Sequence, residues 1–186
     1  MQGEHGDPDA EEVQAIVAAQ HNPIAFADLY MRYQTRIARY VQTHVDQPQD
    51  VEDLTQQIFL QALKALPRYR PRGVPFVTWL FHIAHNVIID TRRRQRFLLS
   101  WESLPEATVT TSMGDPASLA EQRETVGHLH RLLQRLSPAK QELLALRFAA
   151  QLTSVQIAAV VGKSPAAVKK QLTRILRELQ EQYDEP

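Results

Sequence analysis

Apolar residues recur every three or four positions along most of the chain, which is the spacing of amphipathic helices. In the first half, this pattern predicts four helices, over residues 9–20, 26–41, 50–66 and 76–96. In the first of these, Val13, Ile16 and Val17 give the apolar spacing, and Pro23 ends the helix. Residues 68–75 contain two prolines and a glycine and are expected to form a loop.

Short-range capping signals mark a pair of helices near the C-terminus. Thr153 and Gln156 have the spacing of a capping box, in which each side chain bonds the backbone N–H of the other residue. Gly162 then ends a short helix, and Ser164-Pro165 begins the last one. The last helix is expected to bury a stripe formed by Val168, Leu172, Ile175, Leu176 and Leu179. Two helices joined by a turn at a glycine are typical of a helix-turn-helix.

Residues 97–119 break the helical pattern and separate the two halves. Proline and glycine punctuate this stretch, and the threonines at its centre are poor helix formers. A linker is the simplest interpretation, and a short strand over 107–111 is the alternative. Ser137-Pro138 then starts a further helix over 139–149. The expected fold is all-α, with an acidic tail over 1–8, a helical domain over 9–97, a flexible linker over 98–120 and a second helical domain over 121–183.

The composition of the chain excludes several kinds of site and argues against an enzyme. The 186 residues include no cysteine, which excludes disulfides, thiolate catalysis and cysteine-based zinc sites and fits an intracellular protein. No apolar run approaches the roughly 20 residues that cross a bilayer, so membrane insertion is not expected. The sequence also contains no glycine-rich phosphate loop, no Ser-His-Asp arrangement and no metal-ligand cluster. We therefore expect no catalytic residues, no metal and no cofactor.

Charge is balanced in total and segregated along the chain. Lys and Arg number 21, as do Asp and Glu, so the formal net charge is zero. The segment 68–96 nevertheless contains seven arginines and one acid, Asp90, and a second basic zone lies over 163–177. Acidic residues gather in the first twelve positions and over 46–53. Two basic zones beside helical signals favour a polyanionic partner over two solvated helix faces.

The last helix carries residue types that read DNA. With its apolar stripe turned inward, its outward face and flank present Ser164, Ala167, Lys169, Lys170, Gln171 and Arg174. In a helix-turn-helix the N-terminal part of the second helix meets base edges in the major groove. Gln171 suits adenine, Lys170 or Arg174 suits guanine, and the remaining residues suit phosphate. A helical hairpin with a solvated basic face is the alternative.

The loop over 68–75 and the helix after it combine arginines with aromatic rings. Arginine binds phosphate, and an aromatic face stacks on an unpaired base, so this composition suits a melted DNA strand. Phe76 and Trp79 are equally candidates for the core, which leaves Tyr69 as the better stacking residue. His82 and His85 share a helix face, but the sequence offers no third ligand for a metal site.

These segments together resemble bacterial sigma factors. Region 4, the module that reads the minus-thirty-five promoter element, is similar to LSPAKQELLALRFAAQLTSVQIAAVVGKSPAAVKKQLTRILR, residues 136–177. Region 2 is similar to FADLYMRYQTRIARYV, DVEDLTQQIFLQALKAL and RYRPRGVPFVTWLFHIAHNVIIDTRRRQR, in that order. Regions 2 and 4 without region 3 between them are the layout of extracytoplasmic-function sigma factors. The resemblance covers residues 9 to about 181 and implies a promoter-recognition subunit without catalytic activity. An ordinary helix-turn-helix regulator is the alternative.

The resemblance implies a polymerase-binding face on the third helix. Independently of it, the spacing of Asp50, Asp53, Gln57 and Gln61 places them in one polar stripe opposite Leu54 and Ile58. In the family this surface binds the clamp helices of the polymerase beta-prime subunit. The expected contacts are Asp50, Asp53, Gln56, Gln57, Phe59 and Gln61. Position 57 is usually acidic in the family, so Gln57 departs from the motif.

The resemblance also assigns the two DNA-binding surfaces. The expected minus-ten contacts are Arg68, Tyr69, Arg70, Arg72, Trp79, His82, His85, Asn86, Arg93 and Arg94, and the expected minus-thirty-five contacts are the six residues of the last helix. His85 and Gln171 stand where the family usually has arginine. The implied partners are core polymerase, through the beta-prime clamp helices and the beta flap, promoter DNA and an anti-sigma factor, all in the cytoplasm. Apolar residues at 97–101 are a further candidate docking segment within or beside the linker.

Overall fold

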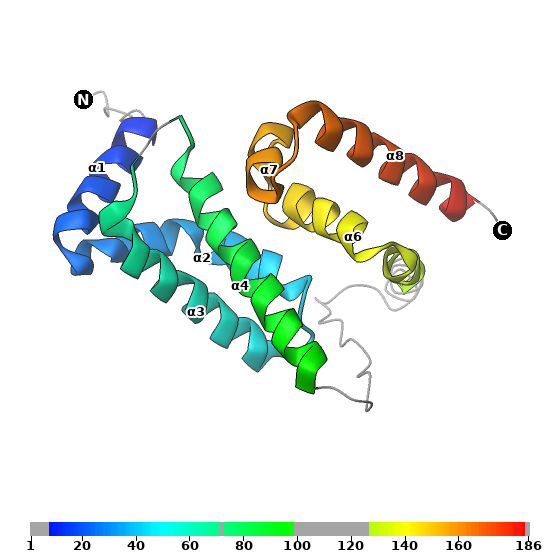
Figure 1. Ribbon diagram of the computed structural model, residues 1–186, viewed down its shortest axis with the longest axis horizontal. Coiled ribbons are helices and arrows are strands. Elements are labelled where there is room, and N and C mark those ends of the chain that lie inside the picture. The colour runs from blue at the N-terminus through cyan, green and yellow to red at the C-terminus, as the bar shows by residue number, and fades with distance from the viewer. Residues whose placement is uncertain (1–7, 71–72, 99–126, 185–186) are drawn as a thin grey trace, which may run out of the picture. The chain divides into compact units, whose positions relative to one another are not determined.

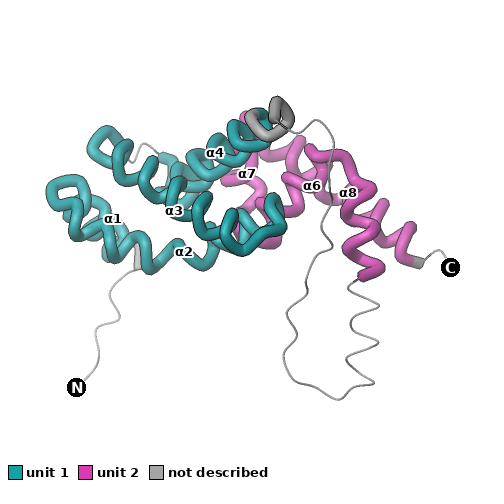
Figure 2. Tube along the Cα trace, turned by 90° about the horizontal axis from the view of Figure 1, so that it is seen from below, with its two compact units in different colours: residues 1–101 teal, residues 102–186 magenta. Residues whose placement is uncertain are grey.

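The computed structural model describes residues 8–70, 73–98 and 127–184, and the side chains of residues 8, 9, 94–98 and 184 are outside the description. The chain divides into two compact units, residues 1–101 and 102–186 (Figure 2). Every regular element in the described ranges is helical, which confirms the predicted all-α fold with two helical units. The alternative strand over 107–111 lies outside the described residues. The apolar segment over 97–101 lies outside the described side chains.

Unit 1 contains four helices and two short 3-10 turns (Figure 1). They are α1 (Pro8–His21), η1 (Pro23–Ala25), α2 (Phe26–Gln42), α3 (Pro48–Ala65), η2 (Leu66–Arg68) and α4 (Phe76–Leu98). The breaks lie where the sequence predicts them. Asn22 accepts a hydrogen bond from the backbone N–H of Ile24, Pro48 opens α3, and Pro67 lies within η2 after α3 has ended.

The core of unit 1 lies where α2, α3 and α4 pack together. Its fully buried side chains come from all three helices, with Tyr40 from α2, Ile58 from α3 and Phe81 from α4 among the largest. The Tyr40 and Phe81 rings meet edge to face, with centroids 5.6 Å apart. This packing makes α3 and α4 rigid supports, because each buries one face and leaves the opposite face in solvent.

Helix α1 differs from the prediction in the face that it buries. Ile16 is buried as expected, but Val13 and Val17 are 52% and 48% exposed. The reason is that the inward face of α1 is partly polar. The Tyr33 hydroxyl of α2 donates to the Glu12 carboxylate, and Gln20 bonds the backbone of η2. Hydrogen bonds of Glu12 and Gln20, rather than valine burial, set the rotation of α1.

Unit 2 begins, within the described residues, with a helix over 127–135. It continues through α6 (Pro138–Leu144), a π-helical turn η3 (Ala145–Ala149), α7 (Ser154–Val161) and α8 (Pro165–Asp184). The helix predicted over 139–149 is therefore α-helical in its first part and π-helical at its end. Helix α8 packs against both α6 and α7.

Helix α8 buries most of the predicted stripe, with one exception. Val168, Leu172 and Ile175 are buried, and Leu179 is half-buried. Leu176 is 46% exposed, so its placement in the buried stripe was wrong. At about 100° per residue, Leu176 lies about 100° around the helix from the buried Ile175, at the edge of the stripe, where solvent reaches it.

Candidate functional site

The turn between α7 and α8 is fixed by local hydrogen bonds. The Thr153 N–H donates to the Gln156 side chain at 2.9 Å, and the Gln156 N–H donates to the Thr153 hydroxyl at 3.3 Å, which confirms the capping box. Gly162 ends α7 in the left-handed conformation at φ +67° and ψ +36°. The Ser164 hydroxyl accepts from the Ala167 N–H at 3.2 Å and so caps the start of α8. These bonds set where α8 begins.

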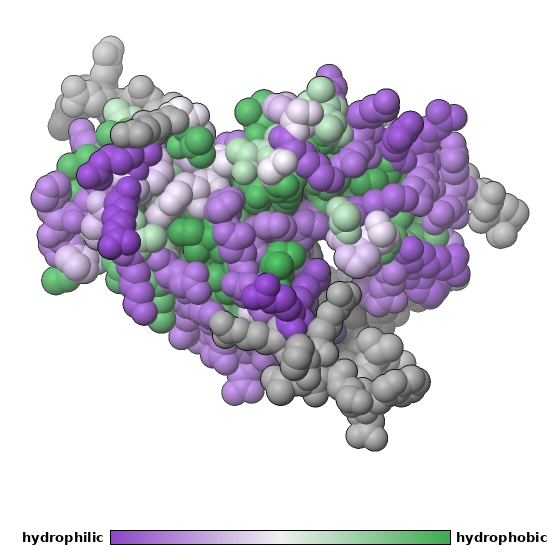
Figure 3. Space-filling view, viewed as in Figure 1, coloured by the Kyte–Doolittle hydropathy of each residue, from purple (hydrophilic) through white to green (hydrophobic). Residues whose placement is uncertain are grey.

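The face of α8 opposite its buried stripe is polar and basic. Lys169, Lys170, Gln171 and Arg174 are exposed, and Ala167 is half-buried. Hydrophilic side chains dominate the surface over α8 in the view of Figure 3. Within the described part of the chain, no ion pair neutralises Lys169, Lys170 or Arg174, whereas Arg177 pairs with Glu181 at 2.9 Å. The first turns of α8 therefore present uncompensated positive charge.

Lys163 belongs to this surface, although the sequence analysis places it only in the basic zone over 163–177 and not among the expected DNA contacts. Its ammonium donates to the Gln171 side-chain oxygen at 3.0 Å from eight residues upstream. This bond uses one of the two lone pairs of the Gln171 amide oxygen. The sequence shows that a lysine lies in the turn. That its ammonium reaches Gln171 depends on the geometry of the turn and cannot be read from the sequence.

The polar stripe of α3 lies in solvent as predicted. Asp50, Asp53, Gln57 and Gln61 are all exposed. Gln56 is exposed as well and donates to Glu52 at 3.2 Å.

Phe59 does not belong to the exposed surface of α3. It is 4% exposed, and its ring lies 4.7 Å from that of Tyr30 and 6.2 Å from that of Phe26. Phe59 lies one residue after the buried Ile58 and three before the buried Ala62, so it faces the core. The resemblance placed Phe59 in the polymerase-binding set by its position in a motif, whereas the structure buries its side chain.

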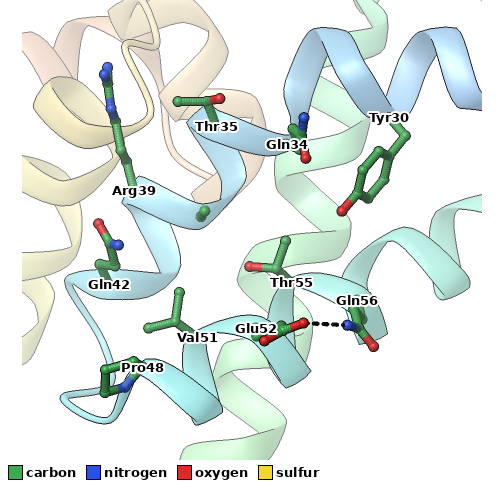
Figure 4. A pocket seen from close by; sticks show the side chains of 11 residues that line it. Tyr30, Gln34, Thr35, Arg39, Gln42, Pro48, Val51, Glu52, Thr55 and Gln56 are labelled. Atoms are coloured by element: carbon green, nitrogen blue, oxygen red, sulfur yellow. Dashed lines mark hydrogen bonds between the residues drawn. The ribbon is translucent and has the colours of Figure 1, made fainter.

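A groove between α2 and α3 adjoins this surface (Figure 4). It has a volume of about 490 Å³. Its lining is mixed, and comprises Tyr30, Gln34, Thr35, Ala38, Arg39, Gln42, Pro48, Val51, Glu52, Thr55 and Gln56. Gln56 and Glu52, joined by their hydrogen bond, lie at one wall, so the groove and the polar face of α3 form a continuous surface.

Tyr69 is buried rather than available for stacking on a base. It is 6% exposed, and its ring packs 4.8 Å from Trp79 and 5.6 Å from Phe76. Its hydroxyl donates to the Val74 carbonyl at 3.1 Å, across the loop. Burial, followed by the charge of Glu12, raises the pKa of Tyr69. The aromatic cluster thus closes the loop, and Trp79, which is half-buried, is its more accessible ring.

The cations of this region have distinct surroundings. Arg68 and Arg70 are exposed, and Arg70 donates to the carbonyls of Pro67 and Tyr69 at 3.3 and 3.1 Å. Arg93 pairs with Asp90 at 3.5 Å. Arg72 and the side chain of Arg94 lie outside the description.

The two histidines of α4 do not act as a pair. His82 is exposed and lies 3.3 Å from the Asn86 amide nitrogen, on the solvent side of the helix. His85 is half-buried, with its Nδ1 3.4 Å from the Tyr40 hydroxyl. Among the described residues, no three His, Cys, Asp or Glu side chains cluster as metal ligands. No helix in the described ranges is both long and apolar enough to span a membrane.

Comparison with known proteins identifies both units. The model of sigma-70 region 2 matches residues 29–97, and the model of sigma-70 region 4 matches residues 128–179. The ECF RNA polymerase sigma factor SigD of Mycobacterium tuberculosis is 30% identical over 189 residues, which cover 98% of this chain and 85% of SigD. BldN of Streptomyces coelicolor, also an ECF sigma factor, is 32% identical over 166 residues, which cover 83% of this chain and 59% of BldN.

A solved structure agrees with these matches. The structure of CnrH in complex with the cytosolic domain of CnrY superposes with a TM-score of 0.65 at 25% identity, and covers 92% of this chain and 96% of CnrH. Both helical units, in the same order, therefore have counterparts in this group of proteins. The chain belongs to the extracytoplasmic-function (ECF) family of RNA polymerase sigma factors.

Proposed function

We propose that this sigma factor binds core polymerase through unit 1 and contacts promoter DNA through the loop over 68–75, α4 and α8. The observation that carries the proposal is the exposed basic face of α8, held at its start by the capping box, Gly162 and Ser164. A helix fixed at its N-terminus, with cations and an amide in its first turns, meets the requirements for reading a major groove. We assign this face to the minus-thirty-five element.

The minus-ten surface follows from the loop and the start of α4. Because Tyr69 is buried, the groups available to a melted strand are the exposed arginines Arg68 and Arg70 and the accessible part of Trp79. Phosphate contacts from the arginines and stacking on one ring provide the affinity, with stacking contributing roughly 1–3 kcal/mol per base. His82 and Asn86 extend this surface along the exposed side of α4. We assign to Tyr69 the role of supporting Trp79.

The exposed stripe of α3 is the proposed contact to core polymerase. Asp50 and Asp53 carry charge that no ion pair neutralises within the described residues, and they favour a basic partner surface. The exposed amides Gln56, Gln57 and Gln61 add hydrogen-bonding groups. Buried Phe59 would support this face from beneath.

We also propose a regulatory protein partner. CnrH, which shares the fold and 25% of aligned residues, was solved in complex with the cytosolic domain of CnrY. By analogy, an anti-sigma factor would bind this chain and cover the surfaces needed for polymerase or promoter. We place this activity in the cytoplasm with the polymerase, and we infer that the chain itself catalyses no reaction because its role is recognition.

Run-off transcription tests the proposal. Purified core polymerase is mixed with the full-length protein and a genomic promoter library, and transcripts are mapped. Start-specific transcripts should appear only when both proteins are present, and the protein alone should bind the selected promoters weakly. Tight, specific binding without polymerase, combined with no gain in transcription, would contradict the proposal.

Charge reversal on α3 tests the assigned polymerase face. Asp53→Lys should weaken binding to core polymerase, because it replaces an attractive charge with a repulsive one. Asp28→Lys on α2 is the matched control, since Asp28 is also an exposed acid but lies outside the stripe. Equal core affinity of the two variants, measured by competition against the parent, would remove the α3 stripe from the interface.

A further inference from the structure

Helix α1 lies outside the segment that matches sigma-70 region 2, which begins at residue 29. It nevertheless contacts both α2 and η2, the turn that leads into the loop over 68–75. Two polar side chains on its inward face make these attachments. Glu12, near the start of α1, accepts from Tyr33, and Gln20, near its end, reaches η2. Helix α1 is thus anchored at both ends by specific hydrogen bonds.

Gln20 joins two points of the loop base that are three residues apart. Its side-chain nitrogen donates to the Leu66 carbonyl at 3.0 Å and to the Tyr69 carbonyl at 2.9 Å. Leu66 is fully buried, and Gln20 is half-buried, so water competes poorly at this position. Leu66 is the first residue of η2 and Tyr69 follows its last, so a single amide bonds the turn at both ends.

A single side-chain nitrogen can bond both the Leu66 and Tyr69 carbonyls only if it has two hydrogens. The NH₂ group of glutamine has two N–H donors, and the two carbonyls take one each. A carboxylate of the same shape would direct oxygen lone pairs at both carbonyls, and an apolar side chain of the same length would leave them without this donor. Position 20 is therefore sensitive to donor capacity rather than to size.

The other end of the loop is held by a residue that Gln20 fixes. Gln20 bonds the carbonyl of Tyr69, and the Tyr69 hydroxyl bonds the Val74 carbonyl at 3.1 Å. The Tyr69 ring also supports Trp79 at 4.8 Å. The order of contacts runs from α1 through Gln20 to Tyr69, and from Tyr69 to Val74 and Trp79. A change at Gln20 is thereby transmitted to the minus-ten surface.

We propose that Gln20 is a positioning residue for minus-ten recognition, through which α1 sets the backbone of residues 66–70 at the base of the loop. The inference rests on the proposed assignment of that loop to the minus-ten element. Gln20 itself touches no DNA. It orders the backbone that carries Arg68 and Arg70 before DNA arrives, so that less conformational freedom is lost on binding.

A structural measurement tests the attachment first. Hydrogen exchange of the full-length protein is compared for the parent, Gln20→Met and Gln20→Glu, with Gln14→Met as the matched control. Gln14 is exposed on the same helix. The Leu66 and Tyr69 amides are the suitable reporters, because they bond the Ala62 and Leu66 carbonyls. Both Gln20 variants should speed exchange of these two amides by about tenfold, the effect of losing one or two ordinary hydrogen bonds, while Gln14→Met should not. Unchanged exchange of both amides in both Gln20 variants would overturn the proposal.

A functional measurement then separates positioning from general stability. Run-off transcription with core polymerase uses a promoter selected by the parent and a set of single-base changes across its minus-ten element. Gln20→Met should reduce discrimination among these templates by about tenfold, with core affinity unchanged. Gln20→Lys, which restores N–H donors at this position, should recover part of the discrimination.

The outcomes separate this inference from the proposed function. A uniform loss on all templates, or discrimination equal to that of the parent, would show that Gln20 only stabilises the fold and would overturn the inference. Failure of the parent protein to direct promoter-specific transcription would instead overturn the proposed function. The exchange experiment remains valid in that case, because it reports the attachment of α1 to the loop without DNA or polymerase.

Discussion

Gly162 offers a test of the turn that positions α8. The residue lies between α7 and α8 at φ +67°, a conformation that side chains other than glycine adopt at a cost. A Cβ atom built on Gly162 meets no atom within 4 Å. Gly162→Ala therefore introduces no clash, and its effect isolates the backbone conformation.

The expected magnitude follows from two opposing effects. The left-handed conformation costs a residue with a Cβ about 1–2 kcal/mol. Alanine also restricts the unfolded chain, which offsets about 0.4–1 kcal/mol of that cost. Gly162→Ala should therefore destabilise unit 2 by about 1 kcal/mol. Gly162→Asn should cost less, because asparagine tolerates this conformation better than alanine.

Gly127 provides a control with the opposite sign. It lies in the helix over 127–135, where a Cβ would make an ordinary contact of 3.8 Å with the Arg131 guanidinium. Alanine is a better helix former than glycine, so Gly127→Ala should stabilise the same unit by up to about 1 kcal/mol. The same chemical change is thus expected to have opposite effects at two positions.

Hydrogen exchange of the full-length protein is the suitable assay. Neither tryptophan of the chain falls in unit 2, so fluorescence reports mainly on unit 1, and exchange at the α7 and α8 amides reports on unit 2. A loss of 1 kcal/mol corresponds to about fivefold faster exchange of the most protected amides. Unchanged or slower exchange in Gly162→Ala would refute the left-handed turn, and a loss above about 3 kcal/mol would refute the open space around it.

Three further outcomes are expected. Thr153→Ala should destabilise unit 2 by about 1 kcal/mol by removing the cap, and Thr153→Ser should not, as measured by the same exchange assay. Burial, followed by the hydrogen bond to Glu12, raises the pKa of Tyr33 above its ordinary value of 10.0, so the folded state holds this proton more tightly than the unfolded state. The corresponding stability is fully present below pH 10 and is lost as the pH rises above it, and Tyr33→Phe should flatten this loss in denaturant titrations. Lys169→Ala with Lys170→Ala should reduce the salt dependence of promoter binding by the polymerase complex, by about 0.9 in the logarithmic slope for each phosphate contact removed, and an unchanged slope would place both lysines off the DNA.

The features that the sequence predicts well are those set by neighbouring residues. The capping box depends on two residues three positions apart, and the left-handed turn depends on Gly162 alone. The exposed stripe of α3 follows from helical periodicity once the helix is recognised. None of these requires knowledge of how one helix packs on another, and all of them agree with the structure.

The features that the sequence misassigns depend on contacts between distant segments. Tyr69 appears in a polar loop, but the rings of Phe76 and Trp79 and the carbonyl of Val74 bury it. Phe59 is placed in the core by Phe26 and Tyr30 on another helix.

The predicted inward face of helix α1 was wrong for the same reason. Gln20 bonds residues 46 and 49 positions away, and hydrophobic periodicity assigns no role to a glutamine on an inward face. The periodicity instead placed Val13 and Val17 inward, although both are exposed. A polar inward face can be recognised only when its partners are known.

The zero net charge of the chain is the sum of acidic and basic residues that lie on different helices. Asp50 and Asp53 on α3, and Lys169, Lys170 and Arg174 on α8, form no ion pairs within the described parts of the chain, so these opposite charges are not used to stabilise the fold. At physiological salt the Debye length is about 8 Å, so each surface acts on a partner within that range largely independently of the total. Binding to non-specific DNA grows with the number of phosphates neutralised, so the affinity of α8 for DNA depends on its own cations rather than on the net charge of the chain. A neutral total is therefore compatible with DNA binding through the basic face of α8, and it leaves the acidic face of α3 available for the polymerase contact proposed above.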